Sequence, residues 1–437
     1  MAGEWTPTVL RNHVELLVGF AFKSERFQTQ PPGIRLVRGD NVTEGSIRWG
    51  DKTRYWPELT PDLRRYQLRP GDVLIGMDGS KVGRNWTRVG DADVPCLLVQ
   101  RVACLRANNT LDQGFLAALI SSQMFKDHID AVKTGSSIPH MSGRQIGEFV
   151  FRFPALVEQR AIAHILGTLD DKIELIRRMN KALEAMARAL FKSWFVDFDP
   201  VRAKAEGRDP GLPKNIANLF PGSFVDSELG EFPEGWGVGT LADFSSLNPE
   251  AWSKETRPAV INYIDLSNTK WGRIEAITTY ARQDAPSRAQ RILRPKDTIV
   301  GTVRPGNGSY AFISEDGLTG STGFAVFRPL RIEYTEFVYL AATAAENIDA
   351  LSHLADGGAY PAVRPEVVAA TPVVLPSGDV LGKFSRLAKP LLAKIAGNDR
   401  ESRTLAALRD ALLPKLLSGE IRVGDYKKQN KIVRIQS

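Results

Sequence analysis

The sequence predicts an α+β protein in which two mixed modules alternate with two long helices. Its 437 residues exceed one ordinary core and suggest about three folding units. Motifs of the first half recur in the second half in the same order, and each half ends in a long stretch with helical spacing. We therefore expect four parts: module 1 at 1–155, a central helix and linker at 156–229, module 2 at 230–377, and a C-terminal helix with a basic tail at 378–437.

Four collinear matches establish the internal repeat. The offset between matched residues drifts only from 231 to 222, as expected when loops change length. The strongest match places LRPGDVLIG (68–76) on LRPKDTIVG (293–301). The other three are EWTPTVL with GWGVGTL, the positions Gly135, Pro139 and Pro154 with Gly357, Pro361 and Pro376, and LEAMARALFKSWF with LAALRDALLPKLL.

Each module has the texture of a mixed α and β domain. Short β-branched runs such as PCLLVQRVACLR and GFAVFRPL are punctuated by Gly, Pro, Asn and Asp, which is typical of strands and turns. Short helices are expected within 110–129 and 335–351. The two cysteines, Cys96 and Cys104, fall in neighbouring strand-like runs and are expected to be reduced and buried.

Helical spacing extends without a break from Val157 to Phe195, a rod of roughly 58 Å at 1.5 Å per residue. Such a rod needs a partner, and the natural one is its repeat copy at 380–417, although two helices packing separately on their own modules stay an alternative. Pro390 and Pro414 predict kinks or breaks in the second copy. The predicted contact positions in the pair or with partners are Ile162, Leu166, Leu169, Ile173, Ile176, Leu183, Met186, Leu190 and Trp194, then Leu391, Ile395, Leu405, Leu408, Leu412 and Leu416.

A segment rich in Pro, Gly and Asp follows Phe195 and predicts a linker that leads into module 2. The net charge of +7 is concentrated in the last 60 residues and the first 155, whereas module 2 is net acidic. Any nucleic-acid surface on module 2 must therefore be local.

Motifs of catalysis are absent from the sequence. It has no Gly-rich phosphate loop, its five histidines lack metal-ligand spacing, and two cysteines cannot form a zinc site. These absences predict a chain that is not itself an enzyme and binds no cofactor or metal. No apolar run is long enough to span a membrane, and the first residues lack the pattern of a signal peptide, which predicts a cytoplasmic protein.

Recognition residues recur at matching places in both modules. Arg can bind guanine through two hydrogen bonds, Asn can bind adenine in the same way, and Lys suits phosphate, so such loops can read duplex DNA. The alternative is a pair of ordinary solvated turns. The candidate DNA contacts are Lys81, Arg84, Asn85, Trp86, Arg88, Ser137, His140 and Arg144 in module 1, and Arg304, Asn307, Ser309, Tyr310, Tyr360 and Arg364 in module 2.

With these residues assembled, the chain resembles the specificity subunits of type I restriction–modification systems. The resemblance covers essentially the whole chain and is carried by VGFAFKSERF, LRPGDVLIG, the stretch from GSSIPHMSGRQ to RRMNKALE, FKSWFVDFDPV and LFPGSFVDSELGEFPEGW. The second half departs from it, because GDVLGKF replaces the Glu-Gln opening of its helix and Pro390 interrupts the rod.

The resemblance implies a fold and a set of partners. Each module would be a target recognition domain that reads one half of a split, asymmetric sequence in double-stranded DNA, and the two helices would pair antiparallel as a spacer. Two methyltransferase subunits would dock on them and bring S-adenosylmethionine, and motor-nuclease subunits would bring ATP and Mg. A structural bracket whose modules bind protein partners is the main alternative, while a nuclease or methyltransferase fragment is disfavoured by the missing motifs.

Overall fold

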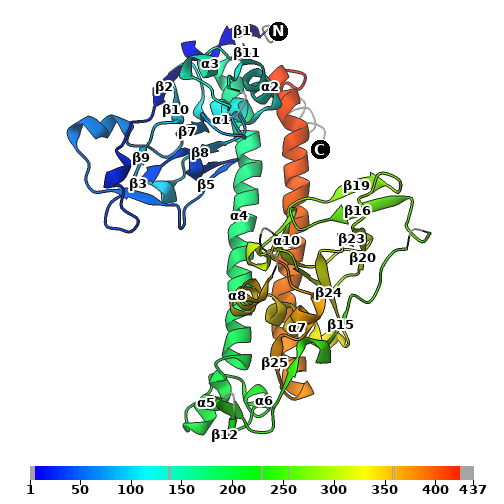
Figure 1. The fold of residues 1–437 in the computed structure, drawn as a ribbon. Coiled ribbons are helices and arrows are strands. Elements are labelled where there is room, and N and C mark those ends of the chain that lie inside the picture. Colours follow the sequence, from blue (N-terminus) through cyan, green and yellow to red (C-terminus); the bar gives the residue numbers. More distant parts are fainter. Residues whose placement is uncertain are drawn as a thin grey trace, which may run out of the picture. The chain divides into compact units, whose positions relative to one another are not determined.

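The computed structural model describes residues 5–135, 139–227, 230–253, 255–356, 358 and 360–423. The chain divides into two compact units, Met1–Leu175 with Ser402–Ser437, and Ile176–Glu401. Each unit therefore combines one module with part of each of the two long helices (Figure 1).

Module 1 is built on a four-stranded antiparallel sheet in the order β2-β10-β7-β8. A second sheet, β6-β3-β9, contains a parallel pair, β3 with β9, and β1 pairs with β11. The bounds are β1 (Thr6–Val9), β2 (Val14–Val18), β3 (Ile34–Val37), β4 (Val42–Thr43), β5 (Ser46–Ile47), β6 (Arg54–Trp56), β7 (Val73–Gly76), β8 (Trp86–Arg88), β9 (Cys96–Leu98), β10 (Val102–Ala107), α1 (Gln113–Ser121), α2 (Gln123–Val132), α3 (Gly143–Gly147) and β11 (Val150–Phe153).

Module 2 repeats this plan. Its antiparallel sheet has the order β15-β24-β21-β22, its second sheet is β19-β16-β23-β20 with a parallel pair, β16 with β23, and β14 pairs with β25. The bounds are β14 (Gly237–Thr240), β15 (Ser245–Leu247), β16 (Val260–Ile264), β17 (Thr269–Lys270), β18 (Arg273–Ile274), β19 (Thr278–Ala281), β20 (Ala289–Leu293), β21 (Thr298–Gly301), β22 (Tyr310–Phe312), β23 (Leu318–Ser321), β24 (Phe324–Pro329), α7 (Thr335–Ala342), α8 (Ala345–Leu354), α9 (Pro365–Ala369) and β25 (Pro372–Leu375).

The aspartate of the repeated LRP motif explains why that motif recurs. In module 1, Arg106 donates from Nε and Nη2 to the two oxygens of Asp72, both at 2.8 Å. In module 2, Arg328 binds Asp297 in the same way, at 2.9 Å for each hydrogen bond. The same carboxylate also accepts the backbone N–H three residues earlier in each module. One aspartate thus fixes a turn and ties two strands of the sheet together.

The two cysteines lie in β9 and β10, and both are buried and free, as predicted. Burial raises the pKa of the Cys96 thiol to about 12, so it stays protonated. Each expected helical stretch inside the modules is two helices rather than one. In module 1 the break falls at Ser122, whose hydroxyl accepts the N–H of Phe125 and caps α2.

Both long helices are continuous: α4 spans Leu156–Phe195 and α10 spans Gly378–Ser418. The prediction that Pro390 and Pro414 break the second rod is therefore wrong. A proline inside a helix costs about 3 kcal/mol through a lost hydrogen bond and a steric clash. Here both prolines lie on the exposed face of α10. The opposite face buries Phe384, Ala388 and Leu392, and this packing offsets the cost.

Within the first unit, the start of α4 packs against the end of α10 and module 1. Ile162 and Leu166 share a core with Leu416 and Leu417. Arg422 donates to Glu158 at 2.7 Å, and Arg409 donates to Asp170 at 2.9 Å. Residue numbers rise along α4 from Glu158 to Asp170, while those of their partners fall from Arg422 to Arg409. The two segments therefore run antiparallel.

Within the second unit, the end of α4 packs against the start of α10 and module 2. The ring centroids of Trp194 and Phe384 are 5.9 Å apart. Further along, Asn398 donates to Asn180 at 2.7 Å, and Asn180 donates to Asp399 at 2.8 Å. The helices therefore pair with each other and with the modules, and the alternative of two separately packed helices is wrong.

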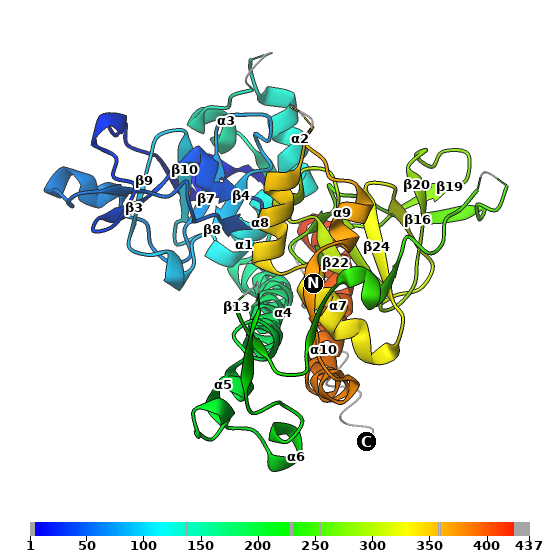
Figure 2. The same ribbon diagram turned by 60° about the horizontal axis from the view of Figure 1, so that its bottom comes forward.

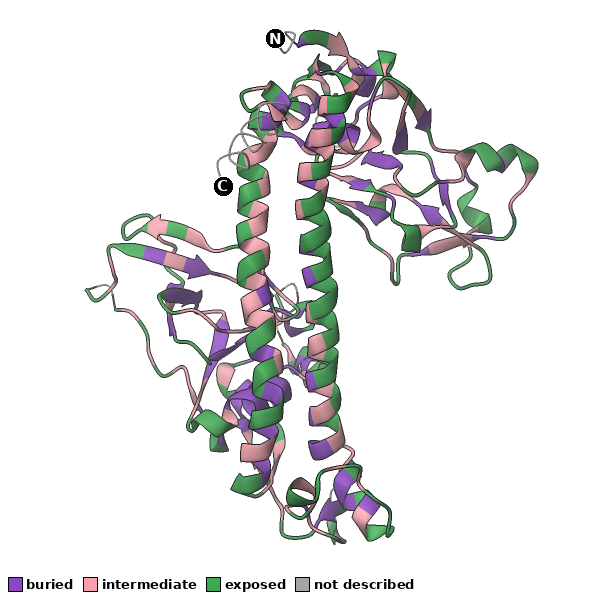
Figure 3. Cartoon of the chain, turned by 180° about the vertical axis from the view of Figure 1, so that it is seen from behind, coloured by how far each residue is buried: buried purple, intermediate pink, exposed green. Residues whose placement is uncertain are grey.

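The predicted contact positions on the helices differ in burial, as Figure 3 shows along α4 and α10. Met186 and Leu408 are exposed by 58% and 47%, so they lie outside the buried contact. The buried positions are Ile162, Leu166, Ile173, Ile176, Trp194 and Leu416. The half-buried positions are Leu169, Leu183, Leu190, Leu391, Ile395, Leu405 and Leu412.

The predicted linker is a folded segment, which corrects its interpretation as a simple connection. It contains α5 (Asp199–Ala205), α6 (Lys214–Ala217) and two paired strands, β12 (Phe224–Ser227) and β13 (Gly230–Pro233) (Figure 2). Val201 and Phe220 are buried in the core of the second unit, where Phe220 packs edge-on against Trp194. Its prolines and glycines shape turns around this apolar contact.

Candidate nucleic-acid interface

The two loops singled out in each module lie side by side. In module 1, the loop after β7 meets the loop before α3, because Gly79 N–H donates to Pro139 at 3.0 Å and Met141 N–H donates to Met77 at 2.9 Å. We call residues 77–85 with 133–135 and 139–141 loop pair 1.

In module 2 the equivalent backbone contacts recur. Arg304 N–H donates to the carbonyl of Pro361 at 2.7 Å, and Val363 N–H donates to Thr302 at 2.9 Å. We call residues 302–309 with 356, 358 and 360–362 loop pair 2. The same hydrogen bonds occur at repeat-related positions, so the two loop pairs occupy the same place in their modules. We call the sheets and strand order that the two modules share the frame.

Loop pair 1 is held together by two aspartates. Asp78 hydrogen-bonds the ring of His140 and forms an ion pair with Arg101 at 3.3 Å. Asp130, at the end of α2, pairs with Arg84 at 3.3 Å and with Lys133. The hydrogen bond from Lys133, helped by the charge of Arg84, lowers the pKa of Asp130, so this carboxylate is ionised at neutral pH.

The remaining predicted cations of module 1 are exposed. Lys81 and Arg88 extend from the loop and from β8, while Asn85 is half-buried. Arg144 is bound to Glu148 at 2.8 Å, and its side chain is 84% exposed. Ser137, also predicted to contact DNA, lies outside the described residues. The exposed donors of this loop pair are therefore mainly arginine and lysine, which suit phosphate and guanine.

Loop pair 2 presents an arginine stacked on an aromatic ring. The guanidinium of Arg304 lies 5.1 Å from the centroid of Tyr360, and Tyr360 is 73% exposed. Asn307 and Arg364 are also exposed. Stacking fixes the plane of the guanidinium, which lowers the entropy lost when it binds a base edge.

Three of the predicted contacts are less exposed than expected. Trp86 packs its ring against the core of module 1, and its indole N–H has no hydrogen-bond partner among the described atoms. Ser309 is buried and donates to the carbonyl of Leu266 at 2.9 Å. Tyr310 is only 5% exposed, and its hydroxyl accepts from Arg188 of α4 at 3.3 Å. The structure therefore exposes none of these three side chains fully: Trp86 is half-buried, and Ser309 and Tyr310 are buried.

Sequence reasoning missed Asp78, Arg101 and Trp271, which all lie at the loop pairs. Arg101 adopts a left-handed backbone, φ 73°, and its carbonyl accepts the N–H of Met77. Gly323 accepts the N–H of Thr302 at the same place in module 2. Arg101 and Gly323 are related by the repeat offset of 222.

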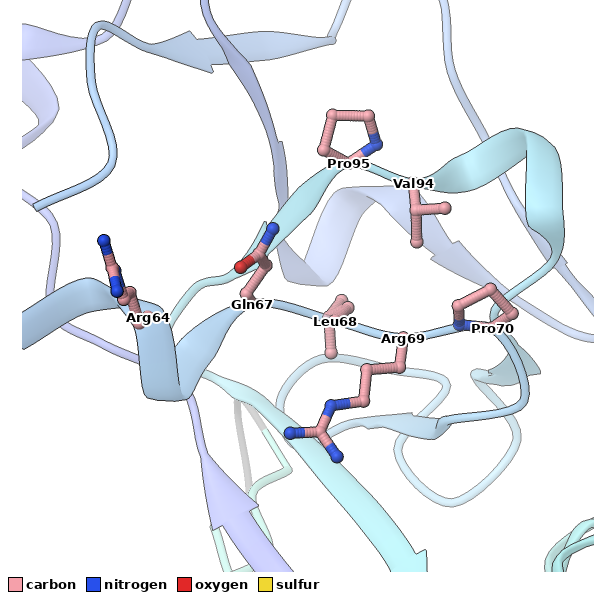
Figure 4. Close-up of a pocket in the computed structure, with 7 residues that line it drawn as sticks. All are labelled: Arg64, Gln67, Leu68, Arg69, Pro70, Val94 and Pro95. Atoms are coloured by element: carbon pink, nitrogen blue, oxygen red, sulfur yellow. The ribbon is translucent and has the colours of Figure 1, made fainter. Parts of the chain in front are cut away.

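A shallow pocket of about 460 Å³ lies elsewhere in module 1 (Figure 4). Its lining contains two arginines but neither a carboxylate nor a histidine, so it offers no acid–base pair. The lining residues are Arg64, Gln67, Leu68, Arg69, Pro70, Val94 and Pro95. Over the described part of the chain, no three His, Cys, Asp or Glu side chains are grouped to hold a metal ion, and no helix is long and apolar enough to cross a membrane.

Comparison with known proteins agrees with this architecture. Residues 50–185 match the family model described as the type I restriction modification DNA specificity domain. Over 409 residues the chain is 26% identical to the HindI specificity subunit of Haemophilus influenzae, covering 83% of this chain and 89% of that one. This chain is similar to type I restriction enzyme specificity subunits along most of its length.

Two further comparisons extend the relationship. The specificity subunit of the type I restriction enzyme MjaIX of Methanocaldococcus jannaschii is 22% identical over 71% of this chain and 69% of its own length. The crystal structure of a type I restriction-modification S subunit from M. genitalium is 16% identical, covers 94% of this chain and 96% of that one, and has a TM-score of 0.58. The solved structure shows that this chain has the fold of that S subunit.

Proposed function

We propose that this chain is the DNA sequence-specificity subunit of a type I restriction–modification complex and reads a bipartite, asymmetric duplex sequence. The observation that carries the proposal is the repeated loop pair, presented at the same site of two copies of one frame. Two similar frames with different loops suit two different half-sites, as dimeric readers suit two identical ones.

Within each loop pair the side chains divide by chemistry. Arg84 and Asn85 of module 1, with Arg304 and Asn307 of module 2, have the hydrogen-bonding groups that distinguish bases in the major groove. Lys81 and Arg88 flank the loop of module 1 and suit phosphate. Base contacts carry the sequence preference, while phosphate contacts fix register and add affinity that falls with salt.

The same proposal implies methyltransferase and motor-nuclease subunits as partners. The exposed apolar side chains of α4, Leu175, Met179 and Met186, with Leu408 of α10, support docking of two methyltransferase subunits on the helices. Those subunits would bind S-adenosylmethionine, and motor-nuclease subunits, where present, would bind ATP and Mg. The chain itself would be the non-catalytic subunit of a DNA adenine methyltransferase, acting in the cytoplasm. The domains would be 1–155, 156–229, 230–377 and 378–437.

The test is to map methylation by the assembled complex. The chain is co-expressed with the methyltransferase subunit of its host in cells free of other adenine methylation, and methylated positions are mapped across the genome. We expect one motif made of two specific blocks separated by a fixed, unspecific spacer. Methylation without sequence preference, or no stable complex with the methyltransferase, would contradict the proposal and would favour the protein-binding bracket.

A further inference from the structure

A short hairpin stands beside the loop pair in each module and aligns residue by residue between the two. Arg48 N–H donates to the carbonyl of Asn41, and Glu275 N–H donates to Asn268, both at 2.7 Å. In each case two residues form the turn, Glu44-Gly45 between β4 and β5, and Trp271-Gly272 between β17 and β18. The second residue is a glycine with φ near +80° in both turns, at 79° and 83°.

The first turn residue differs in charge, size and conformation. Glu44 forms an ion pair with Lys126 of α2 at 2.7 Å, so the tip of module 1 is acidic and tied to its own module. Trp271 is 56% exposed and adopts φ +47°, in the left-handed region. A bulky side chain there is strained, and such strain is retained where another requirement enforces it.

Trp271 is held rigidly against loop pair 2. Its N–H donates to the carbonyl of Gly308 at 2.6 Å, and its ring lies on that glycine, where a Cβ atom would come within 2.5 Å of indole Cδ2. The ring also meets Tyr310 edge-on, with centroids 6.0 Å apart. The indole therefore borders the same surface as Arg304 and Tyr360, with little freedom left to lose on binding.

Two cations flank the indole on the same hairpin. Lys270 and Arg273 occupy the paired positions directly before and after the turn. Neither has an ion-pair partner among the described residues, in contrast to Glu44 of module 1. A rigid exposed aromatic ring between two available cations has the chemistry of a nucleic-acid contact, where rings pack on bases or sugars and cations bind phosphates.

We propose that the tip of the β17–β18 hairpin, with Trp271 between Lys270 and Arg273, is a DNA contact of module 2 that module 1 lacks. This inference rests on the proposed function. The indole packs against the nucleotides of the second half-site, while the two cations bind adjacent phosphates. Module 2 is net acidic, but this hairpin tip is locally basic and can approach the phosphates. Recognition of the module 2 half-site would then depend on a residue outside the loop pair.

The main test replaces Trp271 by Asn, a residue that favours the left-handed first position of such a turn. The Trp271→Asn chain should fold with an unfolding temperature equal to or above that of the native chain. The assembled methyltransferase complex should bind its target duplex about 10- to 100-fold more weakly, the range expected for losing one well-packed aromatic contact at an interface. Methylation mapping should show relaxation in the module 2 block alone. The matched control, Glu44→Asn, should leave both blocks unchanged.

A second variant leaves the turn residues untouched. Lys270→Ala with Arg273→Ala should weaken binding to all duplexes alike and reduce the slope of log K against log salt by about 0.9 for each cation. Native binding and native methylation by both Trp271→Asn and the double variant would overturn the inference, whatever the stability of Trp271→Asn. That result leaves the proposed function intact, because the native complex would still show its bipartite motif; a native complex without any motif would refute the proposed function instead.

Discussion

Module 1 supports its loop pair with carboxylates, whereas module 2 supports its loop pair with aromatic rings. Asp78 and Asp130 hold the cations of loop pair 1, while Tyr360 stacks under Arg304 in loop pair 2. Beneath both pairs, the same arginine–aspartate contact and the same strand order recur. This difference indicates that the frame and the loop surface are separable. Changes in the frame should alter stability in either module, and, under the proposed function, changes at the loop tips should alter recognition in one module.

The largest effect is expected from the buried aspartates of the frame. Asp297→Ala removes the partner of Arg328 and leaves a turn without its acceptor, and Asp72→Ala does the same for Arg106. Breaking such a pair costs about 3–5 kcal/mol. We expect the module that carries the substitution to unfold at a lower urea concentration than in the native chain. Limited proteolysis of the chain across a urea series measures this.

The control for the frame is Asp316→Ala. Asp316 pairs with Arg294 at 3.4 Å, but its side chain is 66% exposed, so its loss should cost less than about 1 kcal/mol. If Asp297→Ala were no more harmful than Asp316→Ala, the shared contact would not hold the frame.

The next effect concerns the polar contact between the helices. Asn398 is 1% exposed and donates to Asn180, so Asn398→Ala removes a buried donor and leaves the half-buried amide oxygen of Asn180 without this partner. This change should reduce stability by about 1–3 kcal/mol, measured as a shift of the denaturation midpoint of the second unit. Lys394→Ala, at an exposed position of the same helix, serves as the control and should shift the midpoint little. Equal midpoints for both variants would mean that the asparagines contribute nothing to the pairing.

A buried carboxyl distinguishes module 2 from module 1. Glu336 lies 222 residues after Gly114, is buried, and accepts a hydrogen bond from Ser385 at 2.7 Å. Burial raises the pKa of Glu336, so the folded state holds its proton more tightly than the unfolded state, and stability falls as pH rises above the ordinary carboxyl range.

Glu336→Gln should therefore remove this loss. We expect the variant to unfold at a higher temperature than the native chain at pH 8, with the difference shrinking toward pH 4, where the native carboxyl is protonated. Thermal unfolding curves across this range test it. A difference that is constant with pH would show that Glu336 does not titrate in the folded state as inferred.

The smallest effect is expected at an exposed cation of loop pair 1. Lys81→Ala should weaken binding of the complex to every duplex alike and lower the slope of log K against log salt by about 0.9. Competition binding at several salt concentrations measures both. A change in the methylated motif with an unchanged slope would instead identify Lys81 as a base contact.

Much of the fold could be predicted because its signals are local. The 3- and 4-residue spacing of apolar side chains predicted α4, and the recurrence of LRP with its aspartate predicted two copies of one frame. The continuity of α10 could not be predicted, because it depends on which face of the helix Pro390 occupies. That face is set by packing against residues far away in the sequence.

The site was predicted less completely for a related reason. The two loop segments of each module were singled out from the sequence, but their contact with each other was not predicted. Trp86 and Tyr310 were expected on the surface, whereas the structure half-buries Trp86 and buries Tyr310. Trp271 was missed because two features single it out, its left-handed backbone and the contact of its ring with Gly308. Neither feature is visible in the sequence.

The central claim is that each module reads one half-site through its own loop pair. The most direct measurement compares the methylation maps of complexes carrying Arg84→Ala or Arg304→Ala, made and assembled in parallel. Losing a base-reading arginine should cost about 1–3 kcal/mol of discrimination at one position. We predict that Arg84→Ala relaxes one block of the motif and Arg304→Ala relaxes the other, with assembly intact in both. Relaxation of the same block by both variants, or an unchanged motif in both, would contradict the account.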